Sequence, residues 1–112
     1  MSFHVVVSRR AKADIREIVT WIRERSAKGA VSWVDALEKS LKQLERTPGS
    51  RARAVEADEF KIDLRQQHFK TRRGNTYRII FVVRETTVHV LTVRGAGQDF
   101  LQPDEIDLTE ES

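Results

Sequence analysis

Cysteine is absent from this 112-residue sequence, which excludes disulfide bonds and thiolate metal sites as the basis of the fold. No apolar run is long enough to span a bilayer. The first residues carry no basic segment ahead of an apolar one, so the sequence does not predict a secretory signal. We therefore expect a cytoplasmic protein that does not act at a membrane.

Several common catalytic and cofactor-binding motifs are also missing. The three histidines, at positions 4, 68 and 89, do not have the spacing of metal ligands. The serines lack the context of a nucleophile elbow. The segment 94–97, Arg-Gly-Ala-Gly, follows a predicted strand without the further residues of a phosphate-binding loop. We expect neither a metal nor another cofactor.

Charge is unevenly distributed along the chain, whose formal net charge is +3. Six of the 17 acids lie in residues 99–112, which contain no Lys or Arg, so residues 1–98 hold all 20 bases against 11 acids. This pattern predicts a basic domain over 1–98 and an acidic tail over 99–112, and it favours a polyanionic partner or an acidic protein that mimics one. The tail either packs back on the basic domain or is a solubilising terminus.

Apolar spacing in the first half of the sequence predicts a strand followed by two helices. Residues 3–7 form a β-branched run, and Ser8 is a suitable N-cap for a helix that reaches about residue 26. A second helix is predicted over 30–46, and the segment 47–49, Thr-Pro-Gly, ends it because proline cannot continue a helix. Two amphipathic helices with so short a connection should form an antiparallel hairpin.

The second half of the sequence predicts strands. Residues 49–60 are polar and small without a clear period, which indicates a loop. The segments 62–73, 76–84 and 87–94 are rich in β-branched and aromatic residues and are expected to be strands. The expected fold is therefore α+β in the order β-α-α-β-β-β. The helical hairpin should pack on one face of a mainly antiparallel four-stranded sheet.

The register between the first two of these later strands decides which side chains share a face. A three-residue turn at 73–75 would place Lys70 opposite Arg78, and His68 opposite Ile80. One face would then be cationic, with His68, Lys70, Arg72 and Arg78. The other would be apolar, with Phe69, Tyr77, Ile79, Phe81 and Val83. A two-residue turn would mix the two sets, so the longer turn is preferred.

Three stretches in this order resemble the RelE/ParE superfamily, the toxins of bacterial type II toxin–antitoxin systems, which include plasmid stabilisation proteins. The first is Ala-Asp-Ile-Arg-Glu-Ile at 13–18 in the first helix. The second is Arg-Arg-Gly-Asn-Thr-Tyr-Arg-Ile-Ile-Phe at 72–81, and the third is Val-His-Val-Leu-Thr-Val-Arg-Gly at 88–95. The resemblance covers about residues 3–100.

The resemblance implies a cognate antitoxin as partner, which wraps the toxin and is encoded beside it. It also implies two different targets. RelE-like members are metal-independent endoribonucleases that cut mRNA in the ribosome, whereas ParE-like members share the fold, inhibit DNA gyrase and need no nuclease site. A non-enzymatic or inactive binding module of the same fold is a further alternative.

The resemblance to RelE-like nucleases assigns candidate site residues on the predicted cationic face. Arg78 matches the arginine of the Tyr-Arg strand motif and would bind the phosphate, while Lys70 and Arg72 lie near the position of the family's basic pair. His68 is a candidate general base. Further nucleic-acid-binding candidates are Arg65, Arg73 and Arg94.

Two departures count against the nuclease mechanism. Arg94 precedes the position of the family's arginine after the last strand, and Phe100 stands where a tyrosine would transfer a proton. The only tyrosine, Tyr77, is expected to face the core. The sequence therefore retains the phosphate-binding half of such a site better than the acid–base half.

Overall fold

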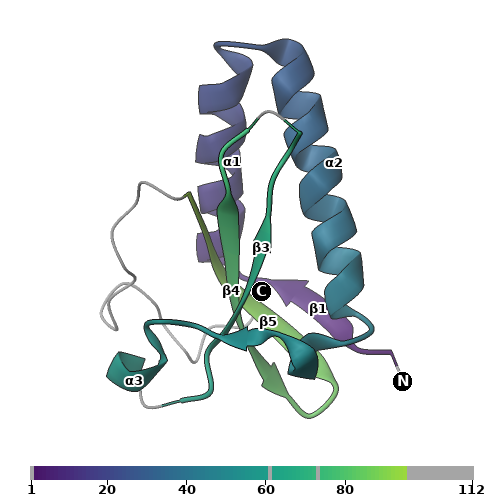
Figure 1. Ribbon diagram of the computed structural model, residues 1–112, viewed down its shortest axis with the longest axis vertical. Coiled ribbons are helices and arrows are strands. Elements are labelled where there is room, and N and C mark those ends of the chain that lie inside the picture. Colours follow the sequence, from purple (N-terminus) through teal and green to yellow (C-terminus); the bar gives the residue numbers. More distant parts are fainter. Residues whose placement is uncertain (1, 61, 73, 96–112) are drawn as a thin grey trace.

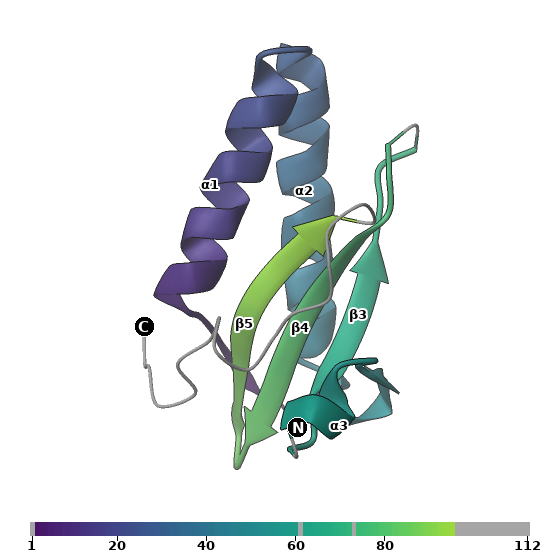
Figure 2. The same ribbon diagram turned by 90° about the vertical axis from the view of Figure 1, so that its left-hand side faces the viewer.

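The computed structural model describes residues 2–60, 62–72 and 74–95, apart from the side chains of Ser50 and Glu59. The expected α+β order is present, with two helices on one face of a sheet (Figures 1 and 2). In chain order the elements are β1 (His4–Val7), α1 (Arg9–Arg23), α2 (Ala27–Leu44), a 3-10 turn η1 (Pro48–Ser50), β2 (Ala52–Arg53), α3 (Ala57–Phe60), β3 (Arg65–Phe69), β4 (Tyr77–Arg84) and β5 (Thr87–Gly95).

The sheet has five strands in the order β1-β5-β4-β3-β2, one more than the sequence predicted. The additional strand, β2, lies in the segment 49–60 that was expected to be a loop. Within the part of the chain that the structure describes, only β1 runs parallel to its neighbour, β5, and the remaining pairs are antiparallel. The first and last strands of the described chain are therefore adjacent. Within the described residues, no helix is long and apolar enough to cross a membrane.

Serine N-caps set the starts of both long helices. The Ser8 hydroxyl accepts a hydrogen bond from the Ala11 amide at 3.1 Å, and the Ser26 hydroxyl accepts one from the Gly29 amide at 2.9 Å. The second helix begins at Ala27, earlier than predicted, because Ser26 caps it and Gly29 is already helical. The hairpin connection is correspondingly short.

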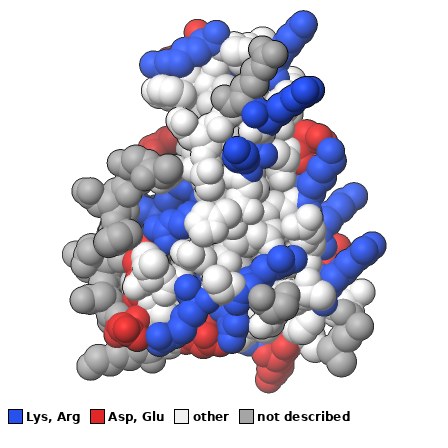
Figure 3. Space-filling model, viewed as in Figure 1, with Lys and Arg blue, Asp and Glu red and all other residues white. Residues whose placement is uncertain are grey.

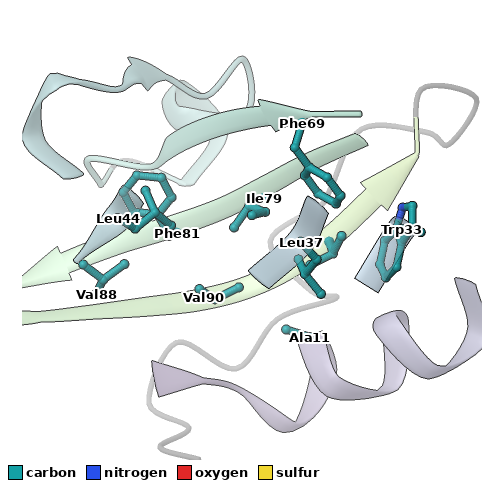
Figure 4. Packing of buried hydrophobic residues seen from close by; sticks show 10 residues of the cluster. Ala11, Trp33, Leu37, Leu44, Phe69, Ile79, Phe81, Val88 and Val90 are labelled. Carbon is teal, nitrogen blue, oxygen red and sulfur yellow. The ribbon is translucent and has the colours of Figure 1, made fainter. Parts of the chain in front are cut away.

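The main core fills the space between the helices and the sheet (Figure 4). Helix α2 contributes Trp33, Leu37 and Leu44, which are at most 4% exposed. The remaining buried members come from α1 and the strands: Ala11, Phe69, Ile79, Phe81, Val88, Val90 and Val93. Each large side chain buried in this way stabilises the fold by about 1.5–3 kcal/mol.

A second core covers the opposite face of the sheet. The chain between β2 and β3 crosses that face and packs against the strands. Its buried apolar residues are Ala54, Ala57, Phe60 and Leu64 from the crossing segment, with Ile80, Val82 and Leu91 from β4 and β5. Strand β4 is therefore apolar on both faces, which is the pattern of a strand covered from both sides. The expectation of one solvated face is wrong for this half of the sheet.

A β-bulge in β5 lets this strand contribute side chains to both cores. Ile80 pairs with Thr92 and Phe81 with Val90, so Leu91 is the extra residue in β5. Because of this residue, Val90 and Val93 both pack on the helix side while Leu91 reaches the second core.

The predicted register between β3 and β4 is wrong by two residues. His68, and not Lys70, lies opposite Arg78, and Phe69 lies opposite Tyr77. The connection spans residues 70–76 and is longer than the predicted turn. Because side chains alternate with a period of two, a two-residue shift keeps the residues within β3 and β4 on their predicted faces. Phe69, Tyr77 and their apolar companions face the helices as expected.

Candidate functional site

Arg78 is held in a two-pronged ion pair with Glu56. Its two terminal nitrogens lie 2.9 and 2.8 Å from the two carboxylate oxygens of Glu56. One of these nitrogens also donates to Gln66 Oε1 at 2.8 Å. The side chains of Arg78 and Glu56 are only 14% and 2% exposed. Bidentate geometry with little solvent makes this a strong interaction, and it gives the guanidinium a fixed orientation.

The surrounding fold explains why this pair forms. Glu56 lies between Ala54 and Ala57, two buried residues of the second core, so the crossing segment carries the carboxylate onto the sheet. Arg78 and Gln66 come from the neighbouring strands β4 and β3. The ion pair therefore fastens the crossing segment to the sheet at the edge of the second core.

This arrangement corrects the expected outward-facing cation at position 78. A charged residue inside an apolar strand must meet an anion or water, and for Arg78 the anion is the carboxylate of Glu56 in the same chain. A phosphate group that bound both terminal nitrogens of Arg78 would have to compete with Glu56 for them.

The expected basic pair is not on the sheet. Lys70 and Arg72 lie in the segment that connects β3 to β4, and both are exposed. His68 is also exposed and is the residue opposite Arg78 in the ladder. Of the four residues assigned to catalysis, only His68 and Arg78 are brought together by strand pairing. Arg73 lies outside the described residues.

The other two arginines that were expected to bind nucleic acid are engaged by the protein. Arg65 donates to the backbone oxygens of Gly49 and Arg51 at 3.0 and 2.8 Å, and it forms an ion pair with Asp63. It therefore fastens the chain before β2 to β3. Arg94 lies opposite Arg78 in the ladder and is 6% exposed. Neither side chain is presented as an open surface cation.

Tyr77 faces the core, as the sequence predicted, within a cluster of three aromatic rings. Its ring centroid lies 5.4 Å from that of Trp33 and 5.8 Å from that of Phe69. Trp33 and Phe69 are 5.5 Å apart. Burial raises the pKa of the Tyr77 phenol above its ordinary value of 10.0, so the group is neutral at physiological pH.

Trp33 and Tyr77 also line a pocket between the tip of the helical hairpin and the β3–β4 connection. Its volume is about 240 Å³. We call it the aromatic pocket, and its lining residues are Trp21, Ile22, Gly29, Trp33, Thr71, Gly74, Asn75 and Tyr77. Within the described residues, no group of three or more potential ligands could hold a metal ion.

Two acidic residues with important contacts were missed by sequence reasoning. Glu56 was placed in a loop and was not assigned a contact with the strand arginine Arg78. Asp14 in α1 accepts hydrogen bonds from the Thr92 hydroxyl and, at 3.3 Å, from the Val93 amide. Asp14 lies in the stretch 13–18, which carried the family resemblance. The residue was therefore noticed in the sequence, but its contact with the last strand was not predicted.

Positive charge is spread over the face of the molecule that Figure 3 shows. Figure 3 shows Lys and Arg side chains around the end of the molecule that holds the hairpin tip and along the side formed by α2. On α2 itself, Lys39 is paired with Asp35 at 3.1 Å.

Comparison with known proteins gives one family match. The family model described as the ParE toxin of the type II toxin–antitoxin system parDE matches residues 5–100. A search of curated proteins finds no match.

Proposed function

The chain belongs to the ParE toxin family of type II toxin–antitoxin systems, and from this premise we propose that it acts by binding DNA gyrase and not by cutting RNA. Membership of the family implies an antitoxin as partner. The choice of target rests on one observation, the engagement of Arg78 by Glu56 and Gln66.

Metal-independent RNA cleavage needs a base for the 2′-hydroxyl, positive charge for the phosphorane and an acid for the leaving oxygen. The positive charge expected from Arg78 is neutralised inside the fold. Lys70 and Arg72 lie on the connecting segment, away from the strand ladder. Tyr77 is packed among aromatic rings, and burial raises its pKa. Of the four residues assigned to catalysis, His68 alone is both exposed and paired opposite Arg78. One histidine does not supply the base, the positive charge and the acid, and this supports a target that is bound through surface contact.

A toxin that binds a large protein target needs an exposed and rigid surface more than a catalytic cluster. The hairpin tip provides such a surface, because Trp21 is 52% exposed and the Arg25 guanidinium lies 3.8 Å from the centre of its ring. Tryptophan and arginine are the residues that contribute most to protein interfaces. Gyrase is a cytoplasmic target, so the proposal places the toxin in the cytoplasm.

Induced expression in bacteria with pulse labelling of DNA, RNA and protein tests the proposal. We expect DNA synthesis to stop first, with induction of the SOS response, while protein synthesis continues. Purified toxin should inhibit supercoiling by purified gyrase and leave mRNA on ribosomes intact. Early loss of protein synthesis with ribosome-dependent mRNA cleavage would instead establish the endoribonuclease, and unchanged growth would favour an inactive binding module.

A matched pair of variants sharpens this experiment. Replacing both Lys70 and Arg72 by alanine removes the expected basic pair from an exposed segment that lies outside the cores. Arg84→Ala removes an exposed cation from the other end of β4 and serves as the control. Under our proposal neither variant changes RNA cleavage, because the unaltered protein does not cleave RNA. A nuclease would lose activity in the first variant only.

A further inference from the structure

The aromatic pocket contains a buried hydrogen-bond donor that lacks an acceptor. Trp33 lines the pocket and is 2% exposed, and its indole Nε1 has no hydrogen-bond partner among the described residues. In Figure 4 this nitrogen lies on the side of the ring away from Ala11 and Leu37. Because a buried donor without an acceptor is destabilising, native proteins rarely retain one. We therefore expect the acceptor to come from a molecule that binds in the pocket.

The pocket has the size of one apolar side chain and lies between two separate segments. The hairpin tip provides one wall and the β3–β4 connection provides the other: Trp21, Ile22 and Gly29 on the first, and Thr71, Gly74 and Asn75 on the second. The pocket volume is about 240 Å³, and a cavity of about 150 Å³ already holds a benzene ring. A side chain of the size of leucine or phenylalanine therefore fits, together with part of the main chain that carries it.

The surroundings of the pocket are cationic. Four exposed cations adjoin lining residues in the sequence, two on each wall: Arg23, Lys28, Lys70 and Arg72. The Arg25 guanidinium also lies 3.8 Å from the centre of the Trp21 ring, and the neighbouring acid Glu24 is already within 3.9 Å of Arg25. The same end of the molecule carries Lys and Arg side chains in Figure 3. A ligand for this pocket should combine an apolar side chain with negative charge.

We propose that the aromatic pocket is the anchor site for an acidic segment of the antitoxin. One apolar side chain of that segment fills the pocket, and a carbonyl or carboxylate oxygen beside it accepts the hydrogen bond from Trp33 Nε1. Acids on either side of this anchor lie against the cations of the two walls. A side chain buried in a well-packed pocket is the kind of contact that contributes most to binding at protein interfaces.

A protein segment fits this arrangement better than a small molecule does. The cations lie on two walls that belong to separate parts of the chain, and an extended segment that crosses the pocket contacts both walls at once. The antitoxin is the partner that membership of the ParE toxin family implies. Trp21 lines the pocket and also belongs to the surface that we propose for target binding, so the same segment covers that surface. The inference rests on the antitoxin and holds whether the target is gyrase or mRNA.

Nuclear magnetic resonance tests the proposal directly, because both tryptophans of the chain, Trp21 and Trp33, line the pocket. Toxin labelled with nitrogen-15 gives one indole N–H signal for each tryptophan, and the variant Trp21→Phe assigns them. The probe is the unlabelled antitoxin, expressed from the gene beside that of the toxin. At saturation we expect the Trp33 indole proton to move downfield and to exchange more slowly with water, because it gains an acceptor.

A matched pair of variants tests whether the pocket contributes to affinity. Asn75→Phe adds a ring at an exposed lining position, and Thr86→Phe adds the same ring in the exposed turn at the other end of β4. We expect Asn75→Phe to weaken antitoxin binding by about tenfold or more, because it blocks the anchor. Thr86→Phe should bind like the unaltered toxin. Calorimetric titration measures the affinities, and circular dichroism verifies that both variants are folded.

Charge reversal tests the cations beside the pocket. Arg72→Glu reverses one exposed charge next to Thr71, and Arg84→Glu reverses one exposed charge at the other end of β4. We expect Arg72→Glu to weaken antitoxin binding more than Arg84→Glu does at low salt. The difference should disappear near 1 M salt, where the Debye length is about 3 Å.

Three results would each overturn the proposal. The first is a Trp33 indole signal that does not move when the antitoxin is saturating. The second is equal antitoxin affinity of Asn75→Phe and Thr86→Phe. The third is an Asn75→Phe variant that loses inhibition of gyrase but keeps its antitoxin affinity, which would assign the pocket to the target. The labelling experiment reports the target of the toxin alone, so the two proposals fail independently.

Discussion

At the scale of single residues, the pairing of Arg78 with Glu56 joins the crossing segment to the sheet. Both groups are largely removed from water, so neither can lose its partner without leaving a buried charge. This is why a residue that looks like a phosphate ligand in the sequence has a structural role in the fold.

Removing either partner alone should therefore destabilise the protein severely. We expect Arg78→Met or Glu56→Gln alone to lower the free energy of unfolding by about 3–5 kcal/mol. The double variant should cost clearly less than the sum, because it leaves no unpaired charge. Urea unfolding of the four proteins measures this coupling. Additive losses would mean that the pair contributes little to stability.

Tyr77 gives a prediction that depends on pH. Burial raises the pKa of its phenol above the ordinary 10.0, so the neutral form is favoured in the folded state. The resulting stabilisation is fully present below pH 10 and is lost as the pH rises toward the folded pKa. Absorbance at the phenolate band should titrate above pH 10 in the native protein, and since the chain has one tyrosine the signal is unambiguous. A native midpoint at or below 10 would contradict the prediction.

At the scale of elements, the residues at the start of α1 form hydrogen bonds with the edge of β5 beyond the point where β1 ends. The Ser8 amide donates to the Val90 oxygen at 3.0 Å, and the Ser8 hydroxyl donates to the Leu91 oxygen at 3.1 Å. One turn later, the Asp14 carboxylate accepts from Val93. The helix therefore satisfies backbone groups that an open sheet edge would expose to pairing with other chains.

Replacing Asp14 should loosen this edge without unfolding the domain. We expect Asp14→Ala to cost about 1–3 kcal/mol, because the Val93 amide and the buried Thr92 hydroxyl lose an acceptor. Amide hydrogen exchange should accelerate at Val93. Exchange at Ile79, in the middle of β4, provides the internal control. Asp35→Ala, which removes an exposed carboxylate from α2, should leave the Val93 rate unchanged.

At the scale of the whole molecule, sequence patterns predicted what depends on local chemistry. Helical spacing and the Ser8 cap predict the two helices, and period-two alternation predicts the faces of β4. The Ser26 cap was not predicted, so the start of the second helix was placed too late. The residues of β3 and β4 lie on their predicted faces although the predicted register was wrong, because the register error was two residues and side chains alternate with the same period.

What the sequence did not predict depends on long-range contacts. The segment with Ala54 and Ala57 looks like a loop because its buried residues are small, and it becomes ordered only against the far face of β4. The carboxylate of Glu56 meets Arg78 for the same reason. A partner that is 22 positions away in the chain leaves no local pattern to detect.

The parallel pairing of β1 with β5 has a consequence for how the toxin is made. Among the described strands, β1 has only β5 as its sheet neighbour, so this sheet stays incomplete until translation reaches Gly95. At about 5–20 residues per second, synthesis of that length takes several seconds. During this interval β1 lacks the strand it pairs with, so the complete sheet forms only after β5 has been synthesised.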